Sequence, residues 1–249
     1  MKHRIVSFLT DFGLTETYVG QVKAVLSNEP LITVIDLCHA IPSFQVRIGA
    51  FELLRSFSHF PKGTIHLAVV DPGVGSNRRC LWVQSEDYQF VGPDNGLLTW
   101  VIHHLEEAGE KIKCFEIPVS VRSTFQARDV FAPAILEFVK TQKIDFRPAP
   151  PIKRLPFSKF QKTKNNLEAT VLTVDHYGNV ILNVPISVAL KGKWNKTTVD
   201  SYPSYEAIPE GKIGVVQGSH GFWEITSNKG TGQKLLQRLK VDDHLLFTF

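Results

Sequence analysis

Cysteine is scarce in this chain, and long apolar runs and blocks of like charge are missing. The three cysteines, Cys38, Cys80 and Cys114, are odd in number and widely spaced, which argues against a disulfide framework and against a paired zinc site. No apolar run reaches the length of a membrane span, and the first residues lack the apolar stretch of a signal peptide. The sequence therefore predicts a cytoplasmic protein that has no membrane partner.

The charge is mildly basic and spread along the chain. The 28 Lys and Arg residues exceed the 24 Asp and Glu residues by four, and no run of five like charges occurs. Solvated surfaces of this kind are common, so we expect no nucleic-acid partner. Hydrophobic residues form 43% and charged residues 21% of the 249 residues, which indicates a globular protein of one large domain or two modest ones.

The first half of the chain alternates strand and helix patterns. Strand-like runs at residues 5–10, 32–37 and 64–70 are separated by two helical faces, at residues 18–26 and 46–57. This alternation predicts an α/β domain at residues 1–150, with a mainly parallel sheet and flanking helices. Ligands of such sheets bind beyond the carboxyl ends of the strands, and Asp11 and Asp71 both lie there.

The second half has a different character. The segment Arg-Pro-Ala-Pro-Pro at 147–151, with the basic and polar stretch after it, predicts a linker at 151–166. Short strands then follow one another closely, and a short helical stretch interrupts them near 233–239. This spacing predicts a smaller β-rich domain at 167–249, a barrel or a sandwich. The expected strands are residues 169–174, 180–184, 212–216, 222–226 and 245–249.

Four polar clusters interrupt the apolar pattern of the first half. Asp11, in Thr-Asp-Phe-Gly, could bind a ribose diol or serve as an ordinary turn or cap residue. Asp71 and Arg78, in and after Asp-Pro-Gly-Val-Gly, could form an ion pair that holds a water, or belong to a plain glycine-rich loop. That loop is neither a dinucleotide fingerprint nor a P-loop. Turn and helix-start chemistry accounts for the other two clusters, at 92–96 and 123–133.

The β-rich half adds two loop clusters, at residues 175–179 and 218–224. An asparagine amide such as that of Asn179 can pair with the edge of adenine, and a tyrosine ring such as that of Tyr177 can stack on a base. Both clusters are also good hairpin turns, so neither decides the function on its own.

Taken together and in this order, the clusters resemble the S-adenosyl-L-methionine (SAM) hydroxide adenosyltransferase family, a relative of the SAM-dependent fluorinases and chlorinases. The resemblance covers nearly the whole chain, and it implies an N-terminal α/β domain and a C-terminal β-barrel. It also implies a homotrimer with active sites between neighbouring subunits, and hydrolysis of SAM, as the substrate, to adenosine and L-methionine without a cofactor. We expect no metal site, because the histidines show no ligand spacing with nearby carboxylates. The motifs that carry it are Thr-Asp-Phe-Gly, Val-Ile-Asp-Leu-Cys-His, Val-Val-Asp-Pro-Gly-Val-Gly, Gly-Pro-Asp-Asn-Gly-Leu-Leu, Thr-Phe-x-x-Arg-Asp-x-Phe-Ala-Pro and Tyr-Gly-Asn.

Residue roles follow from the same resemblance. Asp71 and Arg78 match residues that position the attacking water, and Gln126 stands where the family has a histidine in Thr-Phe-His-Gly-Arg-Asp. The implied substrate-binding residues are Asp11 at the ribose, Glu16 where a second aspartate is usual, Phe125 on the adenosine-contacting loop, Asp175 at the methionine amino group, Tyr177 on the nucleoside, Asn179 at the adenine, Ser219 and His220 at the methionine carboxylate, Glu224, and Ser227 and Asn228 near the adenine edge.

The glutamine bears on the mechanism. A general base typically contributes about 10²–10⁴-fold to a rate. A carboxamide can orient water, but it cannot take a proton near neutral pH. The sequence thus predicts a SAM hydrolase, with a SAM- or adenosine-binding protein of weak or no activity as the alternative. Halogenation is a lesser possibility, because the related halogenases lack the Asp-Pro-Gly-Val-Gly loop and carry a small hydroxyl residue where Ala127 lies.

Overall fold

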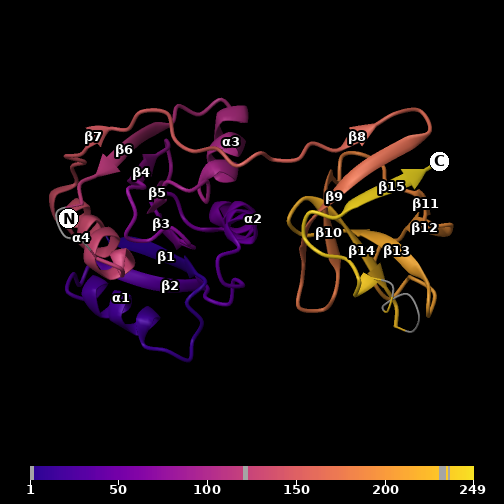
Figure 1. The fold of residues 1–249 in the computed structure, drawn as a ribbon, viewed down its shortest axis with the longest axis horizontal. Coiled ribbons are helices and arrows are strands. Elements are labelled where there is room, and N and C mark those ends of the chain that lie inside the picture. The colour runs from indigo at the N-terminus through magenta and orange to yellow at the C-terminus, as the bar shows by residue number, and fades with distance from the viewer. Residues whose placement is uncertain (1–2, 120–122, 230–233, 235) are drawn as a thin grey trace. The chain divides into compact units, whose positions relative to one another are not determined.

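The computed structural model describes residues 3–119, 123–229, 234 and 236–249 (Figure 1). The chain divides into two compact units, Met1–Leu155 and Pro156–Phe249. The first unit is a layered α/β structure and the second is built from short strands. None of the helices described in either unit is long and apolar enough to cross a membrane.

The N-terminal unit contains a seven-stranded sheet in the order β2-β1-β3-β5-β4-β6-β7. The first four strands in that order are parallel, and β3 is buried along its whole length, as expected for a strand covered on both faces. The strands are β1 (Arg4–Thr10), β2 (Ile32–Cys38), β3 (Ile65–Val69), β4 (Cys80–Gln84), β5 (Gln89–Pro93), β6 (Lys113–Ile117) and β7 (Arg147–Pro148).

The predicted α/β class is confirmed, and the parallel pairing is confirmed for four of the strands. The other three neighbouring pairs, β5–β4, β4–β6 and β6–β7, are antiparallel. The reason is local, since β4 and β5 are joined by a short hairpin and no helix crosses between them. The sheet is therefore mixed.

Helices cover both faces of this sheet, with α1 and α4 together on one face and α2 and α3 together on the other (Figure 1). Beneath α1 and α4, the rings of Trp82 (β4) and Phe138 (α4) contact each other with centroids 4.8 Å apart. They belong to an apolar core that includes Phe8 and Ile135. Full burial of such side chains stabilises the fold by about 1.5–3 kcal/mol each. The helices are α1 (Tyr18–Leu26), α2 (Val46–Ser56), α3 (Thr99–Glu107) and α4 (Ala132–Thr141), with a short turn η1 (Phe57–His59) after α2 and a π-helical turn η2 (Ala127–Phe131) before α4.

One of the buried polar side chains of the sheet is an imidazole. His66 of β3 is 0% exposed, and its Nδ1 lies 2.7 Å from the hydroxyl of Ser7 on β1. The ring of Phe90 stacks on it with centroids 5.1 Å apart, and its Nε2 has no hydrogen-bond partner among the described residues. Burial lowers the pKa of His66 to about 3, so this imidazole is neutral in the folded protein.

The C-terminal unit is a closed β-barrel. Its strands follow the order β10-β14-β13-β12-β11-β15-β9, and the pairing of β9 with β10 closes the ring. Closure removes the sheet edges, while β8 adds a short extension beside β9. The strands are β8 (Gln161–Lys162), β9 (Asn166–Val174), β10 (Val180–Pro185), β11 (Gly192–Trp194), β12 (Thr197–Ser201), β13 (Ile213–Gln217), β14 (Phe222–Ser227) and β15 (His244–Thr248).

The barrel confirms one of the two architectures expected for the second half. The five strands expected from the sequence are all present, while β8, β11 and β12 are additional. Of the helical stretch expected near 233–239, residues 233 and 235 lie outside the described residues. Within 151–166, Lys153 donates its backbone N–H to Asp94, and the backbone carbonyl of Ser158 accepts from Asn183 of β10. These residues therefore pack on the units that they join.

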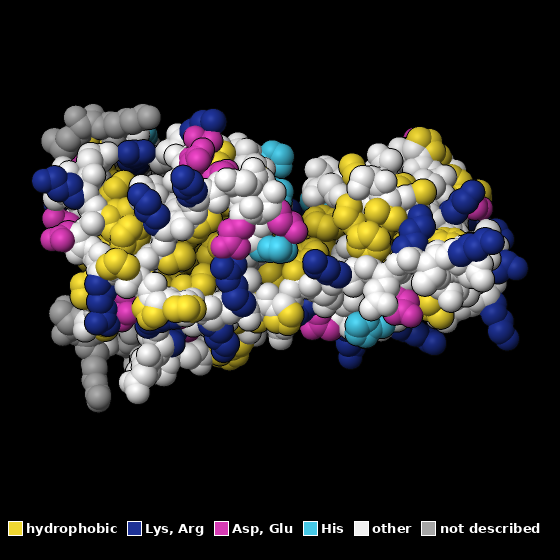
Figure 2. Space-filling model, turned by 90° about the horizontal axis from the view of Figure 1, so that it is seen from above, with side chains coloured by type: hydrophobic (Ala, Val, Ile, Leu, Met, Phe, Trp, Pro, Cys, Tyr) yellow, Lys and Arg dark blue, Asp and Glu magenta, His cyan; other side chains and the backbone are white. Residues whose placement is uncertain are grey.

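Charged side chains are distributed over the surface. On the face drawn in Figure 2, Lys and Arg side chains alternate with Asp, Glu and uncharged side chains on each unit. This is the dispersed pattern expected from the sequence, which has no block of one sign.

Candidate active site

A cavity of about 430 Å³ lies at the carboxyl ends of β1 and β3. Thr10 and Val69 are register partners at the ends of these adjacent strands, so Asp11 and Asp71 emerge beside each other. The cavity is lined by Asp11, Phe12, Tyr18, Ser43, Phe44, Val69, Asp71, Val74, Thr124, Phe125, Gln126 and Ala127. The prediction that the two aspartates share this edge of the sheet is confirmed.

Three of the four aromatic residues that line the cavity form a cluster of rings. Phe12, Tyr18 and Phe125 contact one another, with centroid distances of 5.7 Å for Phe12–Phe125, 5.3 Å for Tyr18–Phe125 and 6.0 Å for Phe12–Tyr18. An apolar pocket with a few polar groups at its margin suits a flat, partly polar ligand of small size.

Asp71 and Gln126 line this cavity, and Arg78 joins them in one hydrogen-bonded cluster. Asp71 and Gln126 are 8% and 4% exposed, so both are nearly enclosed. The Nε of Arg78 donates to Asp71 Oδ1 at 2.9 Å, and its second terminal nitrogen donates to Asp71 Oδ2 and to Gln126 Oε1. The fork-like contact with the carboxylate fixes the direction of both side chains. Arg78 and Gln126 also line a second cavity, of about 670 Å³.

The charges of this cluster stabilise each other. Burial alone would lower the pKa of Arg78, but the hydrogen bonds and charge of Asp71 outweigh burial and raise it. Asp71 Oδ1 accepts from Arg78 and from the backbone N–H of Gly73 at 3.2 Å. Oδ2 accepts only from Arg78 among the described residues, and a carboxylate oxygen has two lone pairs, so Oδ2 keeps one acceptor position.

Local backbone features hold the Asp71 loop in place. Gly75 has φ 78°, a left-handed conformation that glycine adopts without steric cost. The side-chain amide of Asn95 donates to the carbonyl of Val70 at 2.8 Å, just before Asp71. The Gly-Pro-Asp-Asn-Gly segment thus supports the end of β3 besides turning the chain.

Asp11 has a structural partner as well as a place in the cavity. Its Oδ2 accepts the backbone N–H of Phe44 at 2.8 Å. Phe44 has φ 67°, which is costly for a bulky residue, and its side chain is 65% exposed. The carboxylate therefore stabilises a strained turn at the cavity margin, while Oδ1 accepts no hydrogen bond from the residues that the structure describes.

The chain on either side of Gln126 is irregular. Phe125 and Gln126 come directly before η2, a π-helical turn of the kind often found at functional sites. The hydroxyl of Ser123 accepts the backbone N–H of Phe125 at 2.9 Å and donates to Asp129 of η2. Arg128 pairs with Asp129, and it also donates to Gln21 of α1 at 2.7 Å. These contacts anchor the Gln126 backbone.

Glu16 does not reach the cavity in this structure. It is exposed, and its Oε2 accepts the hydroxyl of the neighbouring Thr15 at 2.6 Å. Glu16 therefore lies apart from the cluster formed by Asp11 and Asp71.

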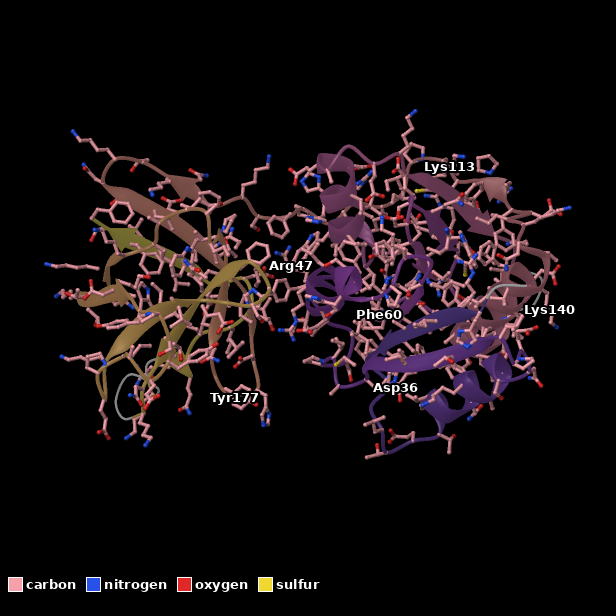
Figure 3. All side chains as sticks on the ribbon, turned by 180° about the vertical axis from the view of Figure 1, so that it is seen from behind. Asp36, Arg47, Phe60, Lys113, Lys140 and Tyr177 are labelled. Carbon is pink, nitrogen blue, oxygen red and sulfur yellow. The ribbon has the colours of Figure 1, made fainter. Side chains whose placement is uncertain are left out.

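In the C-terminal unit, Asp175 and Asn179 meet in the turn between β9 and β10. Asp175 Oδ1 accepts the backbone N–H groups of Tyr177 and Asn179, and its Oδ2 accepts the Asn179 amide at 2.9 Å. Asn179 Oδ1 in turn accepts the hydroxyl of Thr226 on β14 at 2.6 Å. Tyr177 lies at the end of the turn and is 80% exposed (Figure 3).

The other predicted residues of this unit lie on or beside β14. His220 and the buried Glu224 approach to 3.0 Å, and the hydroxyl of Tyr205 donates to Glu224 at 2.6 Å. Burial and the Glu224 carboxylate raise the pKa of Tyr205. Ser219 is exposed in the β13–β14 turn, Ser227 is half-buried, and Asn228 donates to the carbonyl of Ile208.

Several residues of the site were not predicted from the sequence. Phe44 lies in the loop after β2, so the rule of strand carboxyl ends could have found it. Cys80 lies at the start of β4 with its Sγ 3.2 Å from Arg78 and 3.5 Å from Gln126 Oε1. No sequence signal marks it, because it sits in an ordinary apolar strand. Among the described residues, no group of three or more His, Cys, Asp or Glu side chains could hold a metal ion.

Comparison with known proteins places this geometry in a family. Residues 6–146 match the SAM hydroxide adenosyltransferase N-terminal domain, and residues 169–245 match the corresponding C-terminal domain. An (R)-S-adenosyl-L-methionine hydrolase of Thermus thermophilus is 34% identical, over 94% of this chain and 95% of that protein. A fluorinase of Nocardia brasiliensis is 30% identical, over 51% of each chain.

A solved structure agrees with both sequence comparisons. An uncharacterised conserved protein from Thermotoga maritima superposes with a TM-score of 0.85 at 30% identity, covering 97% of this chain and 98% of that one. With both of its domains matched over nearly its full length, the chain belongs to the SAM hydroxide adenosyltransferase family.

Proposed function

We propose that the protein hydrolyses SAM to adenosine and L-methionine. The observation that carries the proposal is the Asp71–Arg78–Gln126 cluster, whose Asp71 and Gln126 line a cavity together with Asp11 and four aromatic residues. The related hydrolase of Thermus thermophilus, 34% identical, supports it.

The chemistry is a displacement at the ribose C5′ carbon. A water oxygen forms a bond to C5′ while the bond from C5′ to the sulfonium sulfur breaks, and the electron pair of that bond stays on sulfur. Methionine leaves as a neutral thioether, so no acid is needed, and one proton is released overall. The work of the site is to hold the water in line and accept its proton.

Asp71 is the group that can accept the proton. Its Oδ2 keeps a free acceptor position, whereas Gln126 cannot act as a base near neutral pH. Arg78 holds the carboxylate in place. Asp11 is proposed to bind the ribose diol through Oδ1, and Phe125 to contact the adenosine ring.

The proposal includes the C-terminal residues as the remainder of the substrate site. Asp175 and Asn179 would bind the methionine amino group and the adenine, and a neighbouring copy in a homotrimer would supply them. The exposed Tyr18 and Phe44, which both line the cavity, support this, because exposed apolar side chains at one site are typical of a surface that a partner covers. Light scattering should then give three times the 28.0 kDa chain mass.

Incubation of the purified protein with SAM tests the activity. Adenosine and methionine should appear in equal amounts, and Asp71→Ala should lower kcat by about 10²–10⁴-fold, the range for loss of a general base. Asp87→Ala is the matched control, because Asp87 pairs with the surface residue Lys62 and should not change turnover. If adenosine is not released faster than by spontaneous breakdown of SAM, the proposal is wrong.

A second candidate is a SAM- or adenosine-binding protein with little turnover. The position of Gln126 favours it, since this carboxamide occupies the contact to Arg78 and brings no base. Gln126→His in an inert parent should create activity if this candidate is right. Brisk turnover by the parent would exclude it.

A further inference from the structure

The orientation of the Gln126 carboxamide is determined by its partner. A guanidinium has only donors, so the amide atom that faces Arg78 must be the oxygen, however the two amide atoms are first assigned. The structure agrees, with Gln126 Oε1 accepting from Arg78. The amide nitrogen is therefore turned away from Arg78.

Cys80 makes a second contact to the same oxygen. Its buried Sγ lies 3.5 Å from Gln126 Oε1 and accepts from a terminal nitrogen of Arg78 at 3.2 Å. Burial raises the pKa of the Cys80 thiol in spite of the nearby Arg78, so the sulfur keeps its hydrogen. A protonated thiol is a weak donor and a weak acceptor, which is what its two neighbours require.

The remaining polar group of Gln126 is its amide nitrogen. Both hydrogen bonds of the Gln126 side chain to described residues are made by Oε1, and Gln126 lines the cavity together with Asp71. What this side chain can offer a ligand is thus an N–H donor. A histidine at this position could offer an acceptor instead.

We propose that Cys80 is a positioning residue that, with Arg78, holds the Gln126 carboxamide so that its N–H donates to the attacking water oxygen. The inference rests on the hydrolysis proposed above. Asp71 takes a proton from the attacking water. The Gln126 N–H donates to the water oxygen as it becomes hydroxide-like, and one lone pair of that oxygen remains to attack C5′. Loss of a donor to developing negative charge typically costs about 10²–10³-fold in kcat.

Two sets of variants separate this role from a merely structural one. Cys80→Ala should lower kcat about tenfold with KM changed less than twofold, while Cys80→Ser keeps a donor and an acceptor and should retain activity within about threefold. Gln126→Glu keeps an oxygen for Arg78 but has no N–H, so kcat should fall about 10²-fold. Cys114→Ala is the matched control, because Cys114 of β6 pairs with Val83 of β4 and lies in another part of the sheet.

The outcomes are distinct. A Cys80→Ser variant as slow as Cys80→Ala, or Cys80→Ala equal to Cys114→Ala, would overturn the positioning role. Gln126→Glu with unchanged kcat would overturn the donor role, since an acceptor would then suffice. Thermal unfolding of each variant shows whether it is folded.

If the parent protein does not hydrolyse SAM, the proposed function is wrong. Crystal structures of the parent and of Cys80→Ala still test the role of Cys80 in that case. In the parent, the Gln126 oxygen should lie within reach of both Cys80 and Arg78, and in Cys80→Ala the carboxamide should rotate. A carboxamide that stays in place without the thiol would refute the role of Cys80.

Discussion

The two units each carry a polar cluster, and the clusters are assembled in opposite ways. In the N-terminal unit, Arg78 reaches Gln126, 48 residues further along the chain; Gln126 is 4% exposed and the side chain of Arg78 is 9% exposed. In the barrel, Asp175 is satisfied by Tyr177 and Asn179 within its own turn. The first cluster depends on the tertiary fold, whereas the second depends mainly on a hairpin. Substitutions should therefore affect stability much more in the first cluster.

The largest effect is expected for Arg78→Met. It leaves Asp71 buried without its partner, which typically costs about 3–5 kcal/mol, and it should abolish measurable SAM turnover because the carboxylate loses its orientation. Urea unfolding checks the stability. The control is Arg154→Met, which breaks the exposed pair with Glu106 and should cost less than about 1 kcal/mol. Equal losses in the free energy of unfolding would show that the Asp71 cluster contributes no more to stability than an exposed ion pair.

A smaller effect is expected on the stability of the protein at low pH, through His66. Its folded pKa is about 3, well below the value near 6.5 of an unfolded histidine, so the unfolded chain binds a proton that the folded chain does not. The contribution of neutral His66 to stability is complete above pH 6.5 and decreases as the pH falls toward 3. Between pH 6.5 and 5 the loss should be about 2 kcal/mol, at roughly 1.4 kcal/mol per pH unit.

Unfolding of His66→Leu over that pH range measures this contribution. The variant should lack the extra loss, while His59→Leu, at an exposed position of η1, should follow the parent. If His66→Leu shows the same pH dependence of the free energy of unfolding as the parent, His66 is not the cause of the loss of stability in acid.

The smallest change in stability is expected for Tyr177→Ala. The ring is 80% exposed, so the free energy of unfolding should change by less than about 0.5 kcal/mol. If the ring packs on the nucleoside, adenosine affinity should nevertheless fall by at least about fivefold, as for loss of a stacking contact worth about 1 kcal/mol or more. Calorimetry on Tyr177→Ala and on the neighbouring exposed His176→Ala distinguishes the two roles. Equal affinities would remove Tyr177 from the site.

The sequence predicted the parts of the site that follow from strand ends. Asp11 and Asp71 each come directly after a buried parallel strand, so the rule of carboxyl ends placed them together. Cys80 escaped prediction because its contact with Gln126 depends on the packing of β4. Phe44 was missed although it lies in the loop after β2, where the same rule could have found it. Glu16 matched a motif position, yet its side chain turns to Thr15.

The fold was predictable to a similar extent. Alternating patterns located β1, α1, β2, α2 and β3, and the closely spaced strands located most of the barrel. The antiparallel half of the first sheet was not expected, because β4 and β5 carry no helix between them to mark the change of direction. The strand β11 has only three residues, which is too short for a clear period, and β12 has the sequence Thr-Thr-Val-Asp-Ser, with Val199 as its single apolar residue.

Arg78 and Arg79 are adjacent in the chain but serve different neighbours. Arg79 pairs with Asp94 and donates to the carbonyls of Pro150 and Pro151, so it fastens the proline-rich exit of the first unit to the rest of that unit. A single peptide bond thus separates the group that orients the proposed proton acceptor from the group that anchors the departing chain. A pulling force on residues 151–155 would reach the chain one residue away from the proposed reacting centre.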